Sequence, residues 1–295
     1  MEPQISERNV RGKIERDFSL KKLNTWHIGG NAELVFWPVS CEDLLKGRSW
    51  CQKNKVKMLL LGRGSNILLP DEGIKGMVIV TSMLKNITWQ EKRIMVEAGY
   101  PLSQLARQAA DKGLEGLEFA CGIPGTVGGA VMVNAGAHGA EISDLVRQVR
   151  VLDQKGEIMT LDREQIEFSY RTSSLQGKYW ILECVLELVP GEPAVLKEKI
   201  RVFTEQRKNA QPLEYPNAGS VFRNPPHLSA GALIEQAGWK GKTVGGAQVS
   251  AKHANFIINT GKATALDVKT LINAITEDIE DKFGIQLKTE VQIFS

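Results

Sequence analysis

The sequence predicts an α+β fold with mixed sheets, and three features of the 295-residue chain support this prediction. Segments typical of strands and segments with helical spacing of apolar residues both occur along the chain. No internal repeat or low-complexity tract interrupts them. Apolar residues make up 42% of the chain and charged residues 24%, which is ordinary for a globular protein. The length is sufficient for two domains, or one large one, with a substantial core.

The first third of the chain is predicted to contain short strands and one helix. Residues 23–38 are expected to form a turn-rich entry into a strand, and residues 41–54 a helix. A buried strand, a glycine turn and a second short apolar run are expected over residues 57–73. Three alternating segments are then expected to form the strands of one meander: residues 76–81, 85–90 and 92–99.

The middle of the chain is predicted to contain a helix, a hairpin and a long strand. Residues 101–113 have proline at the helix start, apolar residues at helical spacing and a terminating glycine. Residues 147–161 are expected to form a hairpin with its loop at Gln154–Gly156, and residues 179–191 a buried strand.

The last third begins with a strongly patterned helix over residues 192–212, and we place a domain boundary close to its start. A shorter helix is expected over residues 229–238 and a strand over 254–261. Thr264 is the candidate N-cap of a long helix that continues through residue 283, with Asp267 favourably placed in its first turn.

A final strand, residues 287–295, closes the chain. Alternation places Glu290 and Gln292 on one face of this strand and Val291 and Ile293 on the other. We therefore expect the valine and isoleucine to pack, while the other face is available to a site.

Composition argues against several classes of function. The net charge of +3 and the lack of a Lys/Arg block argue against nucleic acid as a partner. The four cysteines form no C-x-x-C pair and the four histidines are scattered, so no metal site is predicted. The N-terminal twenty residues have no apolar core, and no apolar run approaches the ~18 residues that span a bilayer. We expect a cytoplasmic protein without membrane insertion and without an obligate protein partner.

Glycine is concentrated in two segments that could hold an anion. Eight of the 28 glycines lie between Gly113 and Gly139, although each costs backbone entropy on folding. The other segment, "LGRGSN", follows an apolar strand, but Ile67 stands where the dinucleotide motif G-x-G-x-x-G needs its third glycine. The sequence "GKT" at 241–243 resembles the end of a P-loop, but Gln236 stands where that motif needs glycine. Ordinary turns and backbone N–H nests for a phosphate both remain open.

Six segments carry a resemblance to a known family. The sequences "NTWHIGG", "LGRGSNILLPDEG" and "GIPGTVGGAVMVNAGAHGAE" resemble the flavin-binding segments of the UDP-N-acetylenolpyruvoylglucosamine reductase family. The sequences "FSYRTS", "NAGSVFRNP" and "TEV" resemble its catalytic segments and follow in the same order. No long insertion follows "SYR", so the chain is similar to the shorter subtype of the family.

The resemblance implies a fold, a reaction and its cofactors. It implies an FAD-binding fold of the vanillyl-alcohol-oxidase type over residues 1–190, split near residue 75, and a substrate-binding domain over residues 191–295. It implies the NADPH-dependent reduction of the enolpyruvyl ether of a UDP-sugar in peptidoglycan precursor synthesis. The implied cofactors are FAD and NADPH, and the implied partners are NADPH and the UDP-sugar.

The resemblance also implies roles for individual residues. Arg171 would bind the substrate carboxylate, Ser220 would donate a proton to the substrate carbanion, and Glu290 would assist the developing enol. Asn224 would contact the substrate. The implied flavin-binding residues come from the two glycine segments: Gly62, Arg63, Gly64, Ser65, Asn66, Gly122, Thr126, Gly128, Gly129 and Asn134. Gln292 departs from the arginine common at this position in the family, and Lys208 is no secure match to the family's lysine.

Two alternatives remain at this stage. One is an oxidase of the same fold, with flavin attached covalently through His27 or Cys121. The other is a UDP-sugar binder that has lost its flavin.

Overall fold

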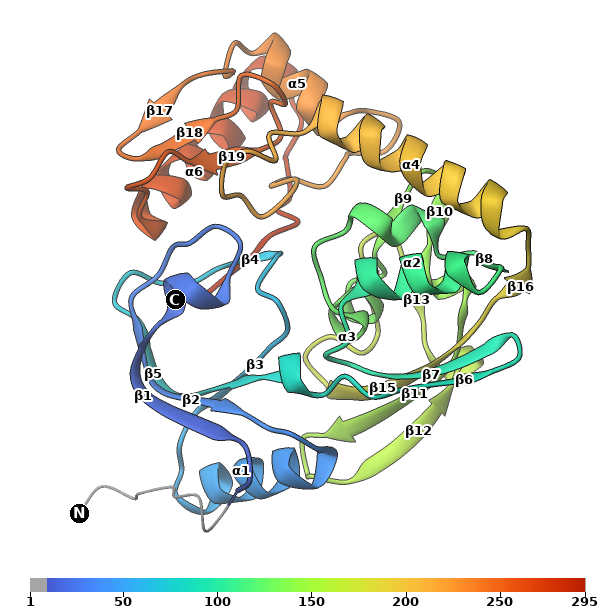
Figure 1. Ribbon diagram of the computed structural model, residues 1–295. Coiled ribbons are helices and arrows are strands. Elements are labelled where there is room, and N and C mark those ends of the chain that lie inside the picture. The colour runs from blue at the N-terminus through green and yellow to red at the C-terminus, as the bar shows by residue number, and fades with distance from the viewer. Residues whose placement is uncertain (1–9, 295) are drawn as a thin grey trace. The chain divides into compact units, whose positions relative to one another are not determined.

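The computed structural model describes residues 10–294, which divide into two compact units, each assembled from three segments (Figure 1). Unit 1 comprises the described residues up to Arg16 together with Leu34–Arg63 and Gly76–Gln206. Unit 2 comprises Asp17–Glu33, Gly64–Lys75 and the described chain from Arg207 onward.

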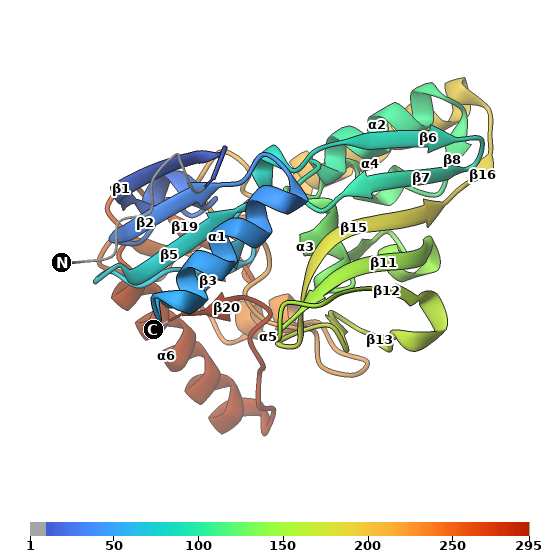
Figure 2. The ribbon, with the colours of Figure 1, turned by 90° about the horizontal axis from the view of Figure 1, so that it is seen from below.

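Unit 1 is built on a five-stranded antiparallel sheet, whose strands run side by side in Figure 2. The strands lie in the order β12 (Ile158–Asp162), β11 (Val146–Asp153), β15 (Tyr179–Glu187), β7 (Arg93–Glu97) and β6 (Ile87–Gln90). The predicted hairpin and the predicted long strand are therefore confirmed as β11–β12 and β15.

Three helices pack on this sheet or beside it. They are α2 (Leu102–Asp111), α3 (Val127–Met132) and α4 (Pro193–Ala210). Apolar residues of α2 and α3 join those of the sheet in one buried cluster. Ile200 and Phe203 of α4 pack against the same cluster. The boundary between the two units falls inside α4, after Gln206.

A second sheet contains strands in the order β1 (Lys13–Ser19), β2 (Asn31–Trp37), β5 (Ile74–Val80) and β3 (Met58–Leu61). Strands β3 and β5 pair in parallel, from Met58 opposite Met77 to Leu61 opposite Val80. Helix α1 (Cys41–Lys53) confirms the first predicted helix, and the Ser40 hydroxyl caps it by accepting a hydrogen bond from Asp43 N.

The predicted meander is wrong for its first strand. Strand β5 pairs with β3, whereas β6 and β7 pair with each other in the five-stranded sheet. Met77–Val80 are all buried, and a continuous apolar run of this kind is typical of a parallel strand that is covered on both faces. A meander strand with one solvated face would alternate instead.

Unit 2 combines a three-stranded antiparallel sheet with two helices. The sheet contains β17 (Thr243–Val244), β18 (Ala247–Val249) and β19 (Ile257–Asn259), and the helices are α5 (Ala230–Gln236) and α6 (Ala265–Phe283). The predicted cap of α6 is confirmed. Thr264 Oγ1 accepts from Asp267 N, and the Asp267 carboxylate accepts from Thr264 N.

The last strand is shorter than predicted. β20 (Gln292–Ile293) pairs in parallel with β4 (Ile67–Leu68). Val291 is buried as expected, but Ile293 is 40% exposed, so its predicted packing is wrong. The pairing covers only two residues, and the packing of Val291 does not extend to Ile293.

The remaining elements are short and connect those above. Two-residue strands are β8 (Leu114–Glu115), β9 (Gly136–Ala137), β10 (Ala140–Glu141), β13 (Phe168–Ser169), β14 (Thr172–Ser173) and β16 (Val189–Pro190). Short 3-10 helices are η1 (Leu20–Leu23), η2 (Thr81–Met83), η3 (Glu118–Gly122), η4 (Ile142–Asp144) and η5 (Arg163–Gln165). None of the helices within residues 10–294 is long and apolar enough to cross a membrane.

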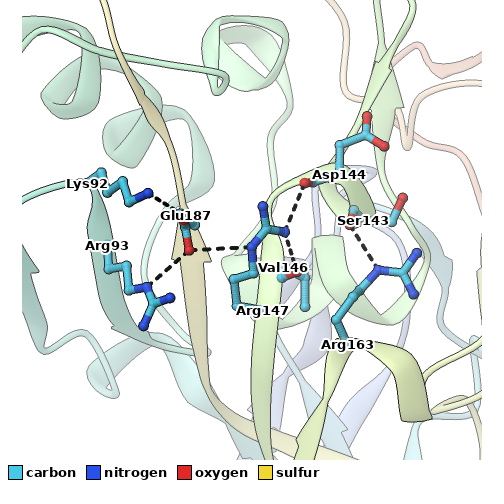
Figure 3. A network of polar contacts seen from close by, with 8 residues as sticks. All are labelled: Lys92, Arg93, Ser143, Asp144, Val146, Arg147, Arg163 and Glu187. Carbon is cyan, nitrogen blue, oxygen red and sulfur yellow. Dashed lines mark hydrogen bonds and ion pairs between the residues drawn. The ribbon is translucent and has the colours of Figure 1, made fainter.

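An ion network ties three strands of the large sheet together at one end (Figure 3). Glu187, the last residue of β15, accepts from Lys92 at 2.9 Å and from Arg93 at 3.0 Å, and lies 3.5 Å from Arg147 Nε on β11. Hydrogen bonds from Lys92 and Arg93 lower the pKa of Glu187 to about 2. The sheet end therefore holds an ionised carboxylate down to strongly acid pH.

Candidate functional site

The glycine turn after β3 leaves a run of backbone donors unused. A Cβ on Gly62 would lie 2.7 Å from Thr126 Oγ1, so only glycine permits this close approach. Gly64 has φ +62°, and a Cβ there would collide with the Leu23 carbonyl. No backbone N–H from Gly62 to Asn66 donates to another described part of the chain. Successive N–H groups of this kind form a nest for an anion.

Thr25 adds an unsatisfied hydroxyl beside this turn. Its backbone N–H donates to Gly64 O at 3.1 Å, which fixes residue 25 against the turn. Its Oγ1 is buried and has no hydrogen-bond partner among the described residues. A buried polar atom without a partner is costly, so this hydroxyl fits a bound polar group. Sequence reasoning did not single out Thr25, because only its burial reveals this feature.

The glycine-rich stretch contains the short helix α3 (Val127–Met132). Thr126 is its N-cap, with Oγ1 accepting from Gly129 N at 3.2 Å. The two central glycines have different surroundings. A Cβ on Gly128 would lie 2.6 Å from Ala98 Cβ, so this glycine is required by packing inside the protein. Gly129 is exposed, and a Cβ there would meet only Thr126 Oγ1, at 3.3 Å.

Asn134, predicted to bind the cofactor, has a side chain that is used within unit 1. It is 1% exposed and left-handed, with φ 47°. Its Nδ2 donates to Glu141 Oε2 at 2.7 Å and to Ser169 O at 3.1 Å, while its Oδ1 accepts from Ser143 N at 3.2 Å. Both amide hydrogens are thus engaged in joining two neighbouring hairpins. Cofactor binding by Asn134 stays a prediction.

Arg171 occupies the two-residue turn between β13 and β14. It is left-handed, with φ 58°. Its Nη2 donates to Gly136 O at 2.8 Å, and its guanidinium carbon lies 5.1 Å from the centre of the Tyr170 ring. Two contacts therefore orient the guanidinium within unit 1. Asn134 and Arg171 are linked indirectly, because Asn134 holds Ser169 at the start of this turn.

The segments that carry Ser220 and Glu290 pair within unit 2. Glu290 N donates to Val221 O at 2.8 Å, and Phe222 forms an isolated antiparallel bridge with Thr289. Ser220 directly precedes the paired residues of one segment, and Glu290 is itself one of the paired residues of the other. Two of the three predicted catalytic residues are therefore brought together by backbone hydrogen bonds.

Asn66 joins the glycine turn to this pairing. Its Nδ2 donates to Glu290 O at 3.2 Å, and Gln292 N donates to Asn66 O at 3.1 Å. Within unit 2, the end of the predicted flavin-binding turn, at Asn66, and the predicted catalytic glutamate are thus neighbours.

Asn224 follows Ser220 on the same segment, and its Oδ1 accepts from Ala230 N at 3.0 Å, at the start of α5. The preceding residue, Arg223, has a buried Nε without a hydrogen-bond partner among the described residues. Sequence reasoning did not single out Arg223 either.

The two positions that depart from the family pattern also lie in unit 2. Gln292 is exposed. The backbone carbonyl of Lys208 accepts a hydrogen bond from Lys252 Nζ at 2.7 Å.

The residues considered for covalent flavin attachment differ in exposure. Cys121 is 3% exposed, and its Sγ lies 3.6 Å from Thr204 Oγ1 and 3.8 Å from Ile200 O, both on α4. Its sulfur therefore faces a helix within unit 1. His27 is exposed and left-handed, with φ 56°. Gly122 ends the 3-10 helix η3, directly after Cys121.

Comparison with known proteins identifies the family. Residues 211–294 match the model described as UDP-N-acetylenolpyruvoylglucosamine reductase, C-terminal domain, and residues 32–162 match the FAD binding domain. The chain is 43% identical over 283 residues to the UDP-N-acetylenolpyruvoylglucosamine reductase of Caldanaerobacter subterraneus, covering 96% of this chain and 94% of that protein. It belongs to the UDP-N-acetylenolpyruvoylglucosamine reductase family.

Two further UDP-N-acetylenolpyruvoylglucosamine reductases agree with this assignment. That of Geobacillus kaustophilus is 42% identical over 97% of this chain and 93% of its own length. The crystal structure of the reductase from Thermus caldophilus superimposes with a TM-score of 0.83 at 33% identity, covering 96% of this chain and all of that one. The predicted family and the predicted fold class are confirmed.

Enzymes of the UDP-N-acetylenolpyruvoylglucosamine reductase family are FAD-dependent oxidoreductases that use NADPH. They reduce enolpyruvyl UDP-N-acetylglucosamine to UDP-N-acetylmuramate in peptidoglycan synthesis. Family membership, together with the FAD-binding domain, confirms the predicted enzyme class and the predicted cofactors of this chain. The match does not assign roles to individual residues, which therefore remain predictions.

Proposed function

We propose that this chain reduces the enolpyruvyl ether of UDP-N-acetylglucosamine enolpyruvate to a lactyl ether, with Arg171, Ser220 and Glu290 as its catalytic residues. The observation that carries the proposal is the hydrogen bond from Glu290 N to Val221 O, which pairs the glutamate segment with the serine segment. The proposed partners are the UDP-sugar and NADPH, in the cytoplasm. We propose no nucleic acid, no membrane insertion and no obligate protein partner.

FAD would be held without a covalent bond by the backbone N–H groups of Gly62–Asn66, which suit a diphosphate, and by Thr25 Oγ1. Arg63 is exposed, and the two glycines of α3 and Gly122 are proposed to approach the flavin along their backbone. When bound, the flavin supplies the hydride that adds to the methylene carbon of the substrate. We assign flavin binding to residues 1–190 and substrate binding to residues 191–295.

Arg171 would stabilise the charge that develops beside the substrate carboxylate. Its planar guanidinium can donate two parallel hydrogen bonds to the two carboxylate oxygens, and it stays charged at any working pH. The bond to Gly136 O and the contact with Tyr170 hold the group in one orientation before substrate arrives. Such pre-organised donors are worth most where negative charge develops in the transition state.

Ser220 would donate its hydroxyl proton to the carbon that carries the carboxylate. The hydride and this proton together saturate the double bond, which gives the lactyl ether. Glu290 would polarise the developing enol or relay the proton. Asn224 would contact the sugar nucleotide with its Nδ2, because its Oδ1 is occupied by the start of α5.

The test follows both halves of the reaction by the absorbance of bound flavin, without oxygen. NADPH should bleach the flavin, and the enolpyruvyl sugar nucleotide should restore its colour. UDP-N-acetylglucosamine, which lacks the enolpyruvyl ether, is the matched control and should leave the flavin reduced. Flavin that is reoxidised by oxygen and not by the enolpyruvyl compound would indicate an oxidase. After denaturation, the yellow colour should separate from the chain.

A further inference from the structure

The peptide segment that follows Ser220 is held on both sides within unit 2. On one side, Val221 O accepts from Glu290 N at 2.8 Å and Arg223 N donates to Lys288 O at 2.9 Å. On the other side lies the chain around Asn255. Residues 221–223 therefore behave as a central strand, although they form only an isolated bridge.

The second side of this strand is made largely by one side chain. Asn255 Oδ1 accepts from Phe222 N at 2.9 Å, and its Nδ2 donates to Phe222 O at 2.8 Å. Its backbone O accepts from Val221 N at 2.8 Å. The primary amide of Asn255 thus satisfies both polar groups of the Phe222 backbone, as a neighbouring strand would.

These bonds bear directly on the conformation of Ser220. The Val221 N–H belongs to the peptide plane that also contains the Ser220 carbonyl, so holding this N–H restricts ψ of Ser220. On the preceding side, Gly219 has φ +77°, and its N–H donates to Asn217 Oδ1 at 3.0 Å. The serine backbone is consequently constrained at both ends.

Asn255 is itself fixed by its surroundings. It is 4% exposed, and its backbone N–H donates to His253 Nδ1 at 3.2 Å. Burial lowers the pKa of His253, which favours the neutral imidazole whose Nδ1 accepts this bond. The partners of Asn255 leave neither its amide oxygen nor its amide nitrogen unsatisfied.

We propose that Asn255 is the positioning residue for Ser220, fixing the direction of the serine hydroxyl through the backbone of Val221 and Phe222. This inference rests on the proposed proton-donor role of Ser220. It predicts that Asn255 affects only the reoxidation of flavin by substrate, since Ser220 takes no part in flavin reduction by NADPH. Nothing in the amide of Asn255 needs to touch the substrate.

The first test is a double-mutant cycle measured by stopped-flow flavin absorbance. Asn255→Ala should slow reoxidation by the enolpyruvyl sugar nucleotide by about 10²-fold, which is the cost of a misplacement near 1 Å. Flavin reduction by NADPH should stay near the wild-type rate. In the Ser220→Ala background, the same Asn255→Ala change should have almost no further effect, because the residue acts through the serine.

The second test uses Asn255→Asp and removes the ambiguity of a misfolded variant. Burial raises the pKa of an aspartic acid, and its neutral form can donate to Phe222 O and accept from Phe222 N as the amide does. Reoxidation should therefore recover in this variant as pH falls. Wild-type enzyme over the same pH range controls for the ionisable groups in and beside this segment, which are Arg223, His253, Lys288 and Glu290.

A matched control is Asn259→Ala. Asn259 is also buried in unit 2, but its amide bonds Trp26 O and the N–H groups of Gly261 and Ala263. Asn259→Ala should lower the unfolding temperature. Any effect that it has on the reoxidation rate should be the same in the wild-type and the Ser220→Ala backgrounds, because Asn259 does not act through the serine. If Ser220→Ala slows reoxidation but Asn255→Ala does not, or if their effects multiply, the positioning role is wrong. If Ser220→Ala itself is silent, the proposed function of the serine fails instead.

Discussion

Ser220 is a weak acid, and a proton-donor role for it depends on its surroundings. A serine hydroxyl in water does not protonate carbon at a useful rate, so position has to supply the advantage. The chain around Ser220 is constrained by a left-handed glycine before it and by paired backbone after it. The sequence alone could not distinguish this arrangement from an ordinary turn.

The first prediction separates the two half-reactions at this residue. Ser220→Ala should leave flavin reduction by NADPH near wild type and slow reoxidation by the sugar nucleotide by roughly 10²–10⁴-fold, the usual range for losing a general acid. Ser220→Cys should retain part of the activity, since a thiol is also a donor. Stopped-flow absorbance of each half-reaction measures both rates. Slow reduction with normal reoxidation in Ser220→Ala would exclude the proton-donor role.

The second prediction concerns the carboxylate. Arg171→Lys keeps the positive charge but loses the planar fork and the bond from Nη2 to Gly136 O. Reoxidation of reduced flavin should slow, while reduction by NADPH continues. Arg163→Lys is the control, because Arg163 also donates to backbone carbonyls of unit 1, those of Ser143 (Figure 3) and Ile166. Equal turnover of wild type and Arg171→Lys would count against the assignment.

At the scale of elements, the glycines of α3 show that one residue type serves two purposes. Sequence reasoning treated Gly128 and Gly129 alike, as backbone that approaches the cofactor. Ala98 leaves no room for a methyl group at Gly128, so packing requires glycine there in any case, whereas Gly129 is exposed. Glycine spacing indicated a special backbone but not which neighbour demanded it.

The third prediction uses this difference. Gly128→Ala should lower the free energy of unfolding by about 1–3 kcal/mol, the usual cost of overpacking a core. Gly129→Ala should preserve stability, because a methyl group there meets only the Thr126 hydroxyl, but it should weaken FAD binding. Urea unfolding of both apo-proteins and titration with FAD provide the measurements. If Gly129→Ala binds FAD as wild type does, the proposed approach of this helix to the flavin is wrong.

At the scale of the whole molecule, the sequence predicted helices better than it predicted which strands pair. Helices α2 and α6 begin where Pro101 and Thr264 indicate, because caps and apolar spacing are local signals. The parallel pairing of β5 with β3 was missed, because register and partner depend on contacts distant in sequence. The site followed the same rule: motifs gave the candidate residues, whereas Thr25, Arg223 and Asn255 were revealed only by burial and hydrogen bonding.

The last prediction concerns acid stability of the folded chain. The pKa of Glu187 is lowered to about 2 in the folded state, below the ordinary value near 4.3 that it regains on unfolding. The unfolded state therefore binds the proton more readily, and the contribution of Glu187 is complete above about pH 5 and is lost as pH falls towards 2.

Glu187→Gln should remove this contribution, so its urea midpoint should lie below that of wild type at pH 6 and approach it near pH 2. Glu277→Gln, on the exposed face of α6, is the control and should leave the difference between pH 6 and pH 2 unchanged. Added salt should shrink the effect, because Lys92 and Arg93 are more than half exposed and their charges are screened. A Glu187→Gln midpoint that follows wild type in parallel from pH 6 to pH 2 would mean that the ion network at the end of β15 does not stabilise the fold.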